Sequence, residues 1–126
     1  AIRVGDRTNV QDGSIVHVMR DTHPTFIGDA VTIVHGVIVH GCTIEDRCLI
    51  CMVAVLLNGC RIGTGSIVAA GALVPEGMVV PEGSMVMGMP ATVRRGLTRD
   101  EDASIADYAA RYTRYRLDYM NEGASV

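Results

Sequence analysis

The sequence predicts a mainly β fold, a parallel β-helix built from hexapeptide repeats, followed by a C-terminal α-helix. An aliphatic residue recurs every six residues, the chain has 14 glycines, and aromatic residues make up only 4% of it. A core with no tryptophan and one phenylalanine must be filled by many small branched side chains in a regular lattice. Such a lattice is typical of repeat architectures rather than of sandwiches or doubly wound sheets.

The hexapeptide register can be followed through most of the first 86 residues. Residues 17–26 interrupt it as an insertion, and one residue is lost between Val39 and Ile44. A period of six does not keep one face of an α-helix, which has 3.6 residues per turn, so short strands are favoured. The aliphatic residues predicted to point inward are Val4, Val10, Val16, Ile27, Ile33, Val39, Ile44, Ile50, Leu56, Ile62, Val68, Val74, Val80 and Val86.

A small or modest residue stands four positions after most of these aliphatics, and cysteine fills this place at Cys48 and Cys60. Cys42 also fits if the later register is extended back. A buried free cysteine behaves as a small apolar residue. Cys48 and Cys51 spell C-x-x-C, but the two would face differently on the coil, so we do not expect a redox or zinc pair there.

After Pro90 the pattern changes to that of an amphipathic helix. Thr98 and Glu101 have the spacing of a capping box, in which an N-cap hydroxyl and a glutamate three residues on bond to each other's backbone N–H groups. The helix is predicted to end near Gly123 and to dock on the β-helix through a stripe at three- and four-residue steps. This stripe comprises Ile105, Tyr108, Tyr112, Tyr115 and Tyr119.

The length of 126 residues fits one domain, with the β-helix at 1–96, a loop at 17–26, and the helix and tail at 97–126. A formal charge of −3 gives no reason to expect nucleic acid or an anionic membrane as partner. No apolar run approaches the ~18 residues of a membrane span, and no signal peptide is present. With four cysteines and no secretory signal, we expect reduced thiols and a cytoplasmic protein.

Three of the four histidines are candidate metal ligands. His17 and His40 each directly follow a repeat aliphatic, and His35 lies one place further on, so all three belong to corners of the coil rather than to its core. Neutral imidazole is a good ligand for Zn²⁺, and three histidines leave a fourth position for water. The spacing alone also fits corner histidines that only form hydrogen bonds in turns.

Three segments resemble the γ-class carbonic anhydrase family. Residues 5–17, which read GDRTNVQDGSIVH, resemble the family motif that ends in its first metal histidine. Residues 31–41, VTIVHGVIVHG, resemble the segment that carries the other two ligands, and residues 90–95, PATVRR, resemble the exit into the family's helix. The match covers nearly the whole chain, and the paired histidine segments are specific.

The resemblance implies a left-handed β-helix, a homotrimer, and metal sites between subunits. His17 and His40 would come from one chain and His35 from its neighbour, so that assembly and metal binding are coupled. The implied activity is reversible hydration of CO₂ to bicarbonate. The implied cofactor is Zn²⁺, with Fe²⁺ or Co²⁺ as alternatives, because all three accept imidazole.

The resemblance also assigns roles around the metal. Gln11 would orient the metal-bound water, Asn9 would line the pocket, and Asp12 would help to fix the interface together with Arg7. Tyr112 aligns with a helix tyrosine that approaches the metal pocket in related proteins. For Asn9 and Asp12 the alternative is turn chemistry, which both residue types favour.

Some features depart from the family pattern. The loop at 17–26 has no glutamate to relay protons, which leaves Asp21 and His23; the alternative for His23 is a solvated loop residue. Val34, Cys51 and Val53 stand where relatives often carry glycine, so we expect strain at these corners. Three functions besides CO₂ hydration stay open: a metal-dependent thioesterase, an acyltransferase-like protein, and a catalytically weak assembly or binding subunit.

Overall fold

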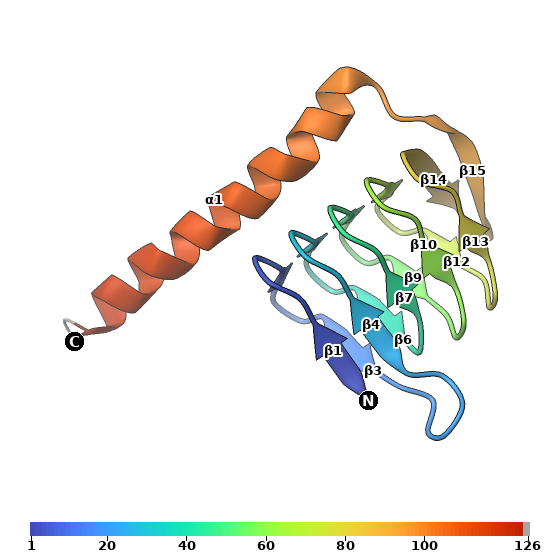
Figure 1. Cartoon of the computed structure of the whole chain (residues 1–126), viewed down its shortest axis with the longest axis horizontal. Helices are drawn as coiled ribbons and strands as arrows, with labels where there is room; N and C mark the ends of the chain where they lie inside the picture. Colours follow the sequence, from blue (N-terminus) through green and yellow to red (C-terminus); the bar gives the residue numbers. More distant parts are fainter. Residues whose placement is uncertain (125–126) are drawn as a thin grey trace.

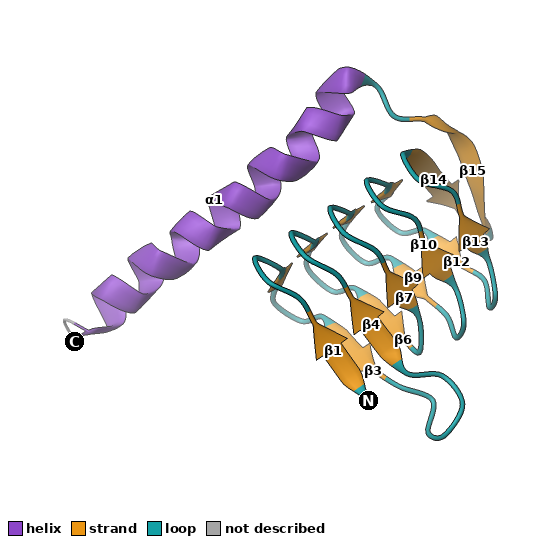
Figure 2. Ribbon diagram, viewed as in Figure 1, coloured by secondary structure: helices purple, strands orange, loops and turns teal. Residues whose placement is uncertain are grey.

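The computed structural model describes residues 1–124, with side chains as far as residue 121. It contains a coil of short strands with one long helix running along it (Figure 1). The coil is a left-handed parallel β-helix, as predicted, and its three faces are sheets of five, six and four strands (Figure 2). The last residues of the predicted tail, 125 and 126, lie outside the described part.

We name the three sheets A, B and C. Sheet A comprises β1 (Ile2–Val4), β4 (Thr25–Ile27), β7 (Thr43–Ile44), β10 (Arg61–Ile62) and β13 (Val79–Val80). Sheet B comprises β2 (Asn9–Val10), β5 (Thr32–Ile33), β8 (Leu49–Ile50), β11 (Ile67–Val68), β14 (Ser84–Gly88) and β15 (Ala91–Gly96). Sheet C comprises β3 (Ile15–His17), β6 (Ile38–His40), β9 (Val55–Leu56) and β12 (Leu73–Val74). All neighbours pair in parallel except β14 and β15, which form an antiparallel hairpin at the end of the coil.

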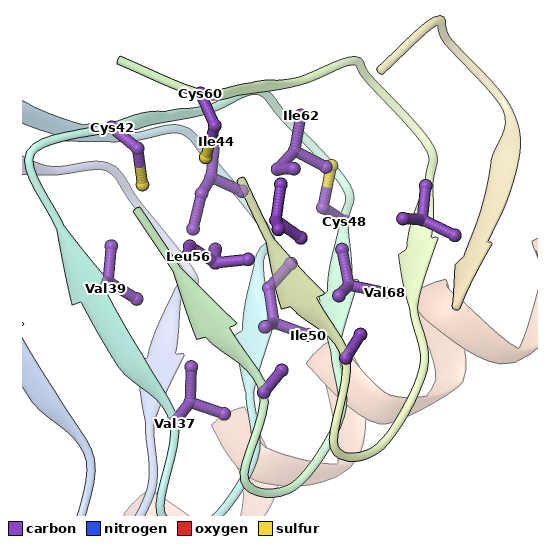
Figure 3. Close-up of a cluster of buried hydrophobic side chains, with 14 of the residues drawn as sticks. Val37, Val39, Cys42, Ile44, Cys48, Ile50, Leu56, Cys60, Ile62 and Val68 are labelled. Carbon is purple, nitrogen blue, oxygen red and sulfur yellow. The ribbon is translucent and has the colours of Figure 1, made fainter. Parts of the chain in front are cut away.

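The predicted aliphatic columns form the core. In sheet C, for example, Val39 lies in register with Leu56, and Leu56 with Val74, so each side chain packs between the coils on either side of it (Figure 3). Ile27 and all later members of the predicted inward series are buried. On the first coil, by contrast, Val4 and Val10 are 49% and 42% exposed. The prediction of burial is wrong for these two in the described chain, in which the first coil has a neighbouring coil on one side only.

The cysteines follow the prediction. Cys42, Cys48 and Cys60 are buried in the core with free thiols, whereas Cys51 is half-buried in a separate cluster beneath the helix. Burial raises the pKa of the Cys48 thiol to about 11, so this side chain is a neutral apolar filler at physiological pH. Cys48 and Cys51 therefore do not form a functional pair.

Of the three corner residues predicted to be strained, one has a strained backbone. Val53 has a φ of 56°, a conformation that a β-branched residue rarely adopts. Val34 and Cys51 do not have positive φ, so the prediction of strain is wrong for them. Their half-buried side chains instead pack against the cluster of Leu49, Ile67 and Ile105 beneath the helix.

The helix α1 (Arg99–Ala124) begins with the predicted capping box. The backbone N–H of Glu101 donates to Thr98 Oγ1 (3.2 Å), and the backbone N–H of Thr98 donates to Glu101 Oε1 (2.9 Å). Arg95 on β15 also donates to the Glu101 carboxylate (2.6 Å), which lowers the pKa of Glu101 to about 2. The chain therefore enters the helix through an interlocked ion pair and cap.

The docking face of α1 differs from the tyrosine stripe that the sequence predicts. Ile105 and Ala109 are 2% and 6% exposed and make the contact with the coil, whereas Tyr119 is 78% exposed. Tyr108 and Tyr115 are also exposed, and Tyr112 is half-buried. The stripe prediction is therefore confirmed for Ile105 and wrong for Tyr108, Tyr115 and Tyr119. The C-terminal turns of α1 extend past the first coil (Figure 1).

No helix in the described part of the chain is both long and apolar enough to cross a membrane.

Candidate metal centre

Two of the candidate ligands, His17 and His40, lie side by side at the end of sheet C. Strands β3 and β6 pair in parallel with His17 directly opposite His40. Because side chains at paired positions of a sheet point the same way, the two rings stack, with centroids 5.1 Å apart and planes inclined by 25°. Nδ1 of His17 lies 3.2 Å from Nε2 of His40, so two imidazole nitrogens face each other.

This separation fits a tetrahedral metal ion. Two nitrogens that each lie ~2.0–2.1 Å from one ion, at a tetrahedral angle, are roughly 3.3 Å apart. The observed separation of 3.2 Å is close to that value. The donor set of neutral imidazoles suits Zn²⁺, Co²⁺ and Fe²⁺ alike.

His35 occupies a different corner of the coil. It follows β5 in sheet B and is exposed, and its carbonyl oxygen accepts a hydrogen bond from the backbone N–H of Val53 on the next coil (2.9 Å). Among the residues that the structure describes, no group of three or more histidine, cysteine, aspartate or glutamate side chains could hold a metal ion. A single chain thus brings together two of the three predicted ligands and holds the third apart.

Buried Thr25 holds together the backbone of both paired histidines. Its hydroxyl donates to the carbonyl oxygen of His17 and accepts from the backbone N–H of Gly41, the residue after His40 (3.0 Å). The same Gly41 N–H lies 3.1 Å from the His17 carbonyl oxygen. Thr25 is completely buried, so this bracing is shielded from competing water.

The ring of His40 has a partner on its far side. Its Nδ1 lies 2.6 Å from Oδ1 of Asn58. Sequence reasoning missed both Thr25 and Asn58. A signal for Asn58 was present, since it stands two residues after Leu56, the registered partner of Val39 on the next coil, and therefore close to His40. No comparable signal marked Thr25, which comes from the inserted loop.

Asn9 and Gln11 are linked, and they belong to the corner of His35. Gln11 Nε2 donates to Asn9 Oδ1 (3.1 Å), and Asn9 Nδ2 donates to Thr32 Oγ1 (3.1 Å). The backbone N–H of Gln11 donates to the carbonyl of Ile33, two residues before His35. Gln11 Oε1 is buried without a hydrogen-bond partner in the described chain. Because such an atom is costly to leave unsatisfied, it marks a place for an additional donor such as water.

Tyr112 and Asp12 complete the predicted set. Tyr112 lines a groove of about 320 Å³ together with Asn9, Arg7 and Arg116, so the helix does bring its tyrosine next to the polar network of the first coil. Asp12 is exposed, and its carbonyl oxygen accepts from the backbone N–H of Gly36 beside His35 (3.1 Å). Within the described chain Arg7 and Asp12 do not pair with each other.

The remaining histidine, His23, is packed rather than simply solvated. It is half-buried and forms an antiparallel bridge with Met19 in the loop. Its Nδ1 lies 3.1 Å from Thr22 Oγ1, and its ring lies over Gly59, where an added Cβ would be 3.4 Å from the ring atoms. Asp21, the other relay candidate, is exposed at a φ of 65°.

Comparison with known proteins finds similarity to hexapeptide transferases and to carbonic anhydrases. The model of the family of bacterial transferase hexapeptides (six repeats) matches residues 41–76. The chain is 44% identical over 113 residues to a Methanocaldococcus jannaschii protein named probable carbonic anhydrase, covering 90% of this chain and 70% of the relative. It is 42% identical over 128 residues to gamma carbonic anhydrase 1, a mitochondrial protein of Arabidopsis thaliana.

That second match covers 98% of this chain but 46% of the Arabidopsis protein, so the chain spans about half the length of this relative. Among solved structures, a hexapeptide transferase family protein from Anaplasma phagocytophilum superimposes with a TM-score of 0.87 at 33% identity. The superposition covers 92% of this chain and 68% of that one.

Proposed function

Because the chain belongs to the γ-class carbonic anhydrase family of hexapeptide-repeat proteins, we propose that it catalyses the reversible hydration of CO₂ to bicarbonate. The proposed site lies between subunits of a homotrimer, with His17 and His40 from one subunit and His35 from the next. The observation that supports the proposal is the facing pair of imidazole nitrogens, 3.2 Å apart, in a chain whose described part holds no third ligand beside them.

The surfaces beside the two histidine corners support an intersubunit site. Next to the His17–His40 pair, the outward residues of sheet C form an apolar column in register: Ile15, Ile38, Val55 and Leu73. Ile15 and Ile38 are exposed in the single chain. The corner of His35 likewise carries exposed Met52 and Val53. In a cyclic trimer these two unlike surfaces would meet, because each subunit presents one of them to each neighbour.

Residues of the chain would then have separate roles in binding the metal and in orienting the attacking water. A zinc-type ion lowers the pKa of bound water from 15.7 to about 7, so hydroxide becomes available at neutral pH. Gln11 Oε1 is the unsatisfied acceptor that would hold the attacking water by its hydrogen, and Asn9 fixes the Gln11 amide. Asn9 in turn donates to the hydroxyl of buried Thr32, so the two amides are held in place by a side chain of the coil interior. CO₂ is small and apolar and needs no acyl pocket.

Stopped-flow CO₂ hydration on the metal-reconstituted protein tests the proposal, with His35→Ala as the comparison. We expect turnover in the unchanged protein and its loss in His35→Ala, while circular dichroism shows the same fold in both. His23→Ala then tests proton relay, since a relay defect lowers turnover most in weak buffer. A protein that carries metal and forms trimers but does not hydrate CO₂ would contradict the proposal.

The likeness to a hexapeptide transferase family protein favours a second candidate, acyl transfer or thioester hydrolysis on the same fold. The two activities separate cleanly in one experiment: the same preparation is offered CO₂ and, separately, an acyl-CoA. Turnover on acyl-CoA alone would assign the second candidate. Turnover on neither substrate, with metal bound, would leave an assembly or binding subunit.

A further inference from the structure

The environment of His40 on the side away from His17 assigns a role to Asn58. We propose that Asn58 is a positioning residue that holds His40 in one tautomer, with Nδ1 protonated and Nε2 free to bind a metal ion. The inference rests on the proposed metal site for its purpose. The contact itself, Nδ1 of His40 to Oδ1 of Asn58 at 2.6 Å, is a property of the single metal-free chain.

The chemistry of the contact fixes the proton. A carboxamide oxygen can only accept a hydrogen bond, so the nitrogen of His40 that faces it must be the donor. In a neutral imidazole the other nitrogen then carries a lone pair. That other nitrogen, Nε2, is the one that lies 3.2 Å from Nδ1 of His17. The Asn58 contact therefore aims the ligand atom of His40 at the place where the ion would bind.

A consequence for His17 follows from the same geometry. In the metal-free chain His40 Nε2 is an acceptor, so at 3.2 Å His17 Nδ1 is the donor. Metal binding requires a lone pair on both nitrogens. His17 must therefore move its proton to Nε2, whereas His40 keeps the tautomer that it already has. The two ligands are not equivalent, and Asn58 is what distinguishes them.

The backbone around Asn58 leaves room for this arrangement. Gly41 lies beneath the amide with a φ of 61°, and an added Cβ there would be 2.5 Å from Asn58 Oδ1 and 2.8 Å from His23 Cβ. Asn58 is itself fixed to the next coil, since its carbonyl oxygen accepts from the backbone N–H of Gly77 (3.0 Å). Partners of this kind, behind a metal-binding histidine, typically change metal affinity by roughly 10–100-fold.

Histidine tautomers read by long-range ¹H–¹⁵N NMR on the metal-free protein give the first test. We expect His40 protonated at Nδ1 in the unchanged protein and a mixture of tautomers in Asn58→Ala. Asn121→Ala, an exposed asparagine on α1, is the matched control and should leave the His40 signals unchanged. His40 protonated at Nε2 in the unchanged protein, or an unaltered tautomer in Asn58→Ala, would overturn the inference.

Metal affinity gives the second test, by competition of Zn²⁺ or Co²⁺ with a chromophoric chelator. We expect Asn58→Ala to bind roughly 10–100-fold more weakly, and Asn58→Asp, which restores an acceptor oxygen, to recover most of the loss. A loss of affinity in Asn58→Ala that the aspartate does not restore would count against positioning by the acceptor oxygen. If the tautomer shifts as expected but the unchanged protein binds no metal, the contact stands and the proposed function fails.

Discussion

The glycine that follows His40 offers a sharp test of how the coil makes room for the site. Gly41 and Gly71 have similar left-handed backbones, with φ of 61° and 70°. An added Cβ at Gly71 would meet nothing within 4 Å, whereas at Gly41 it would lie 2.5 Å from Asn58 Oδ1. Gly41→Ala and Gly71→Ala therefore share a conformational cost and differ in a steric one.

The magnitudes follow from these two terms. A left-handed alanine costs about 1–2 kcal/mol. The reduced freedom of the unfolded chain offsets about 0.4–1 kcal/mol of that. This leaves about 1 kcal/mol for Gly71→Ala. Overpacking adds about 1–3 kcal/mol, so Gly41→Ala should lower the free energy of unfolding by about 2–4 kcal/mol in total.

Urea denaturation of the metal-free proteins measures the difference, at one fixed protein concentration because an oligomer's stability depends on it. We expect Gly41→Ala to unfold at clearly lower urea than Gly71→Ala, and its metal affinity to fall as well because Asn58 is displaced. Equal destabilisation of the two variants, within about 0.5 kcal/mol, would refute the packing around Gly41 described above.

Three further predictions concern the rest of the chain. Leu56→Ala should lower the free energy of unfolding by about 2–5 kcal/mol, because Leu56 is fully buried between two coils. Leu117 is 48% exposed, so Leu117→Ala should lower it by less than about 0.5 kcal/mol. Similar losses for the two variants in urea denaturation would argue against the described core. Glu101 has its pKa lowered from 4.5 to about 2, first by Arg95, so its stabilising contribution is complete above pH 4.5 and is lost as the pH falls towards 2. Acid titration of helix content should therefore differ between the unchanged protein and Glu101→Gln, the difference shrinking below pH 4.5; a constant difference would contradict the ion pair. Burial raises the pKa of the Cys48 thiol to about 11, so this thiol should not react rapidly with a disulfide reagent at pH 8. The unchanged protein and Cys48→Ala should therefore show the same number of rapidly reacting thiols. One fewer rapidly reacting thiol in Cys48→Ala would contradict the burial of Cys48.

The coil was predictable from sequence because its period is local. One aliphatic residue in six specifies the strand, the inward face and the layer, so the buried column of Val39, Leu56 and Val74 needs no long-range information. The first coil was not predictable in the same way. Val4 and Val10 obey the pattern but are exposed, since burial depends on a neighbouring coil rather than on the residue itself.

The docking face of the helix could also not be predicted from the periodicity of the sequence. Ile105 belongs both to the predicted stripe and to the docking face, but the sequence does not say whether the tyrosines or the alanines beside it meet the coil. The structure selects Ala109 and Ile105, because the close approach of helix and coil favours small side chains, and leaves Tyr119 in solvent.

For the site, the sequence identified the histidines but not what holds them. Corner positions for His17 and His40 follow from the repeat, yet their adjacency depends on how the inserted loop returns to the coil. Thr25 lies at the end of that loop, and nothing in its neighbours indicates that its hydroxyl braces both histidines. Asn58 could have been found by aligning successive coils, because it stands two residues after Leu56, which lies in register with Val39 beside His40.

The most direct test of the intersubunit site is complementation between two defective subunits. One carries His35→Ala and keeps the His17–His40 pair, and the other carries His17→Ala and keeps His35. Each alone should bind no metal, whereas co-expressed in equal amounts they should recover roughly a quarter of the metal of the unchanged protein, because each mixed trimer holds one complete site. Recovery near that level is the result that we predict. Folded mixed trimers with no recovered metal, or full metal in either variant alone, would contradict a site built from His17 and His40 of one subunit and His35 of the next.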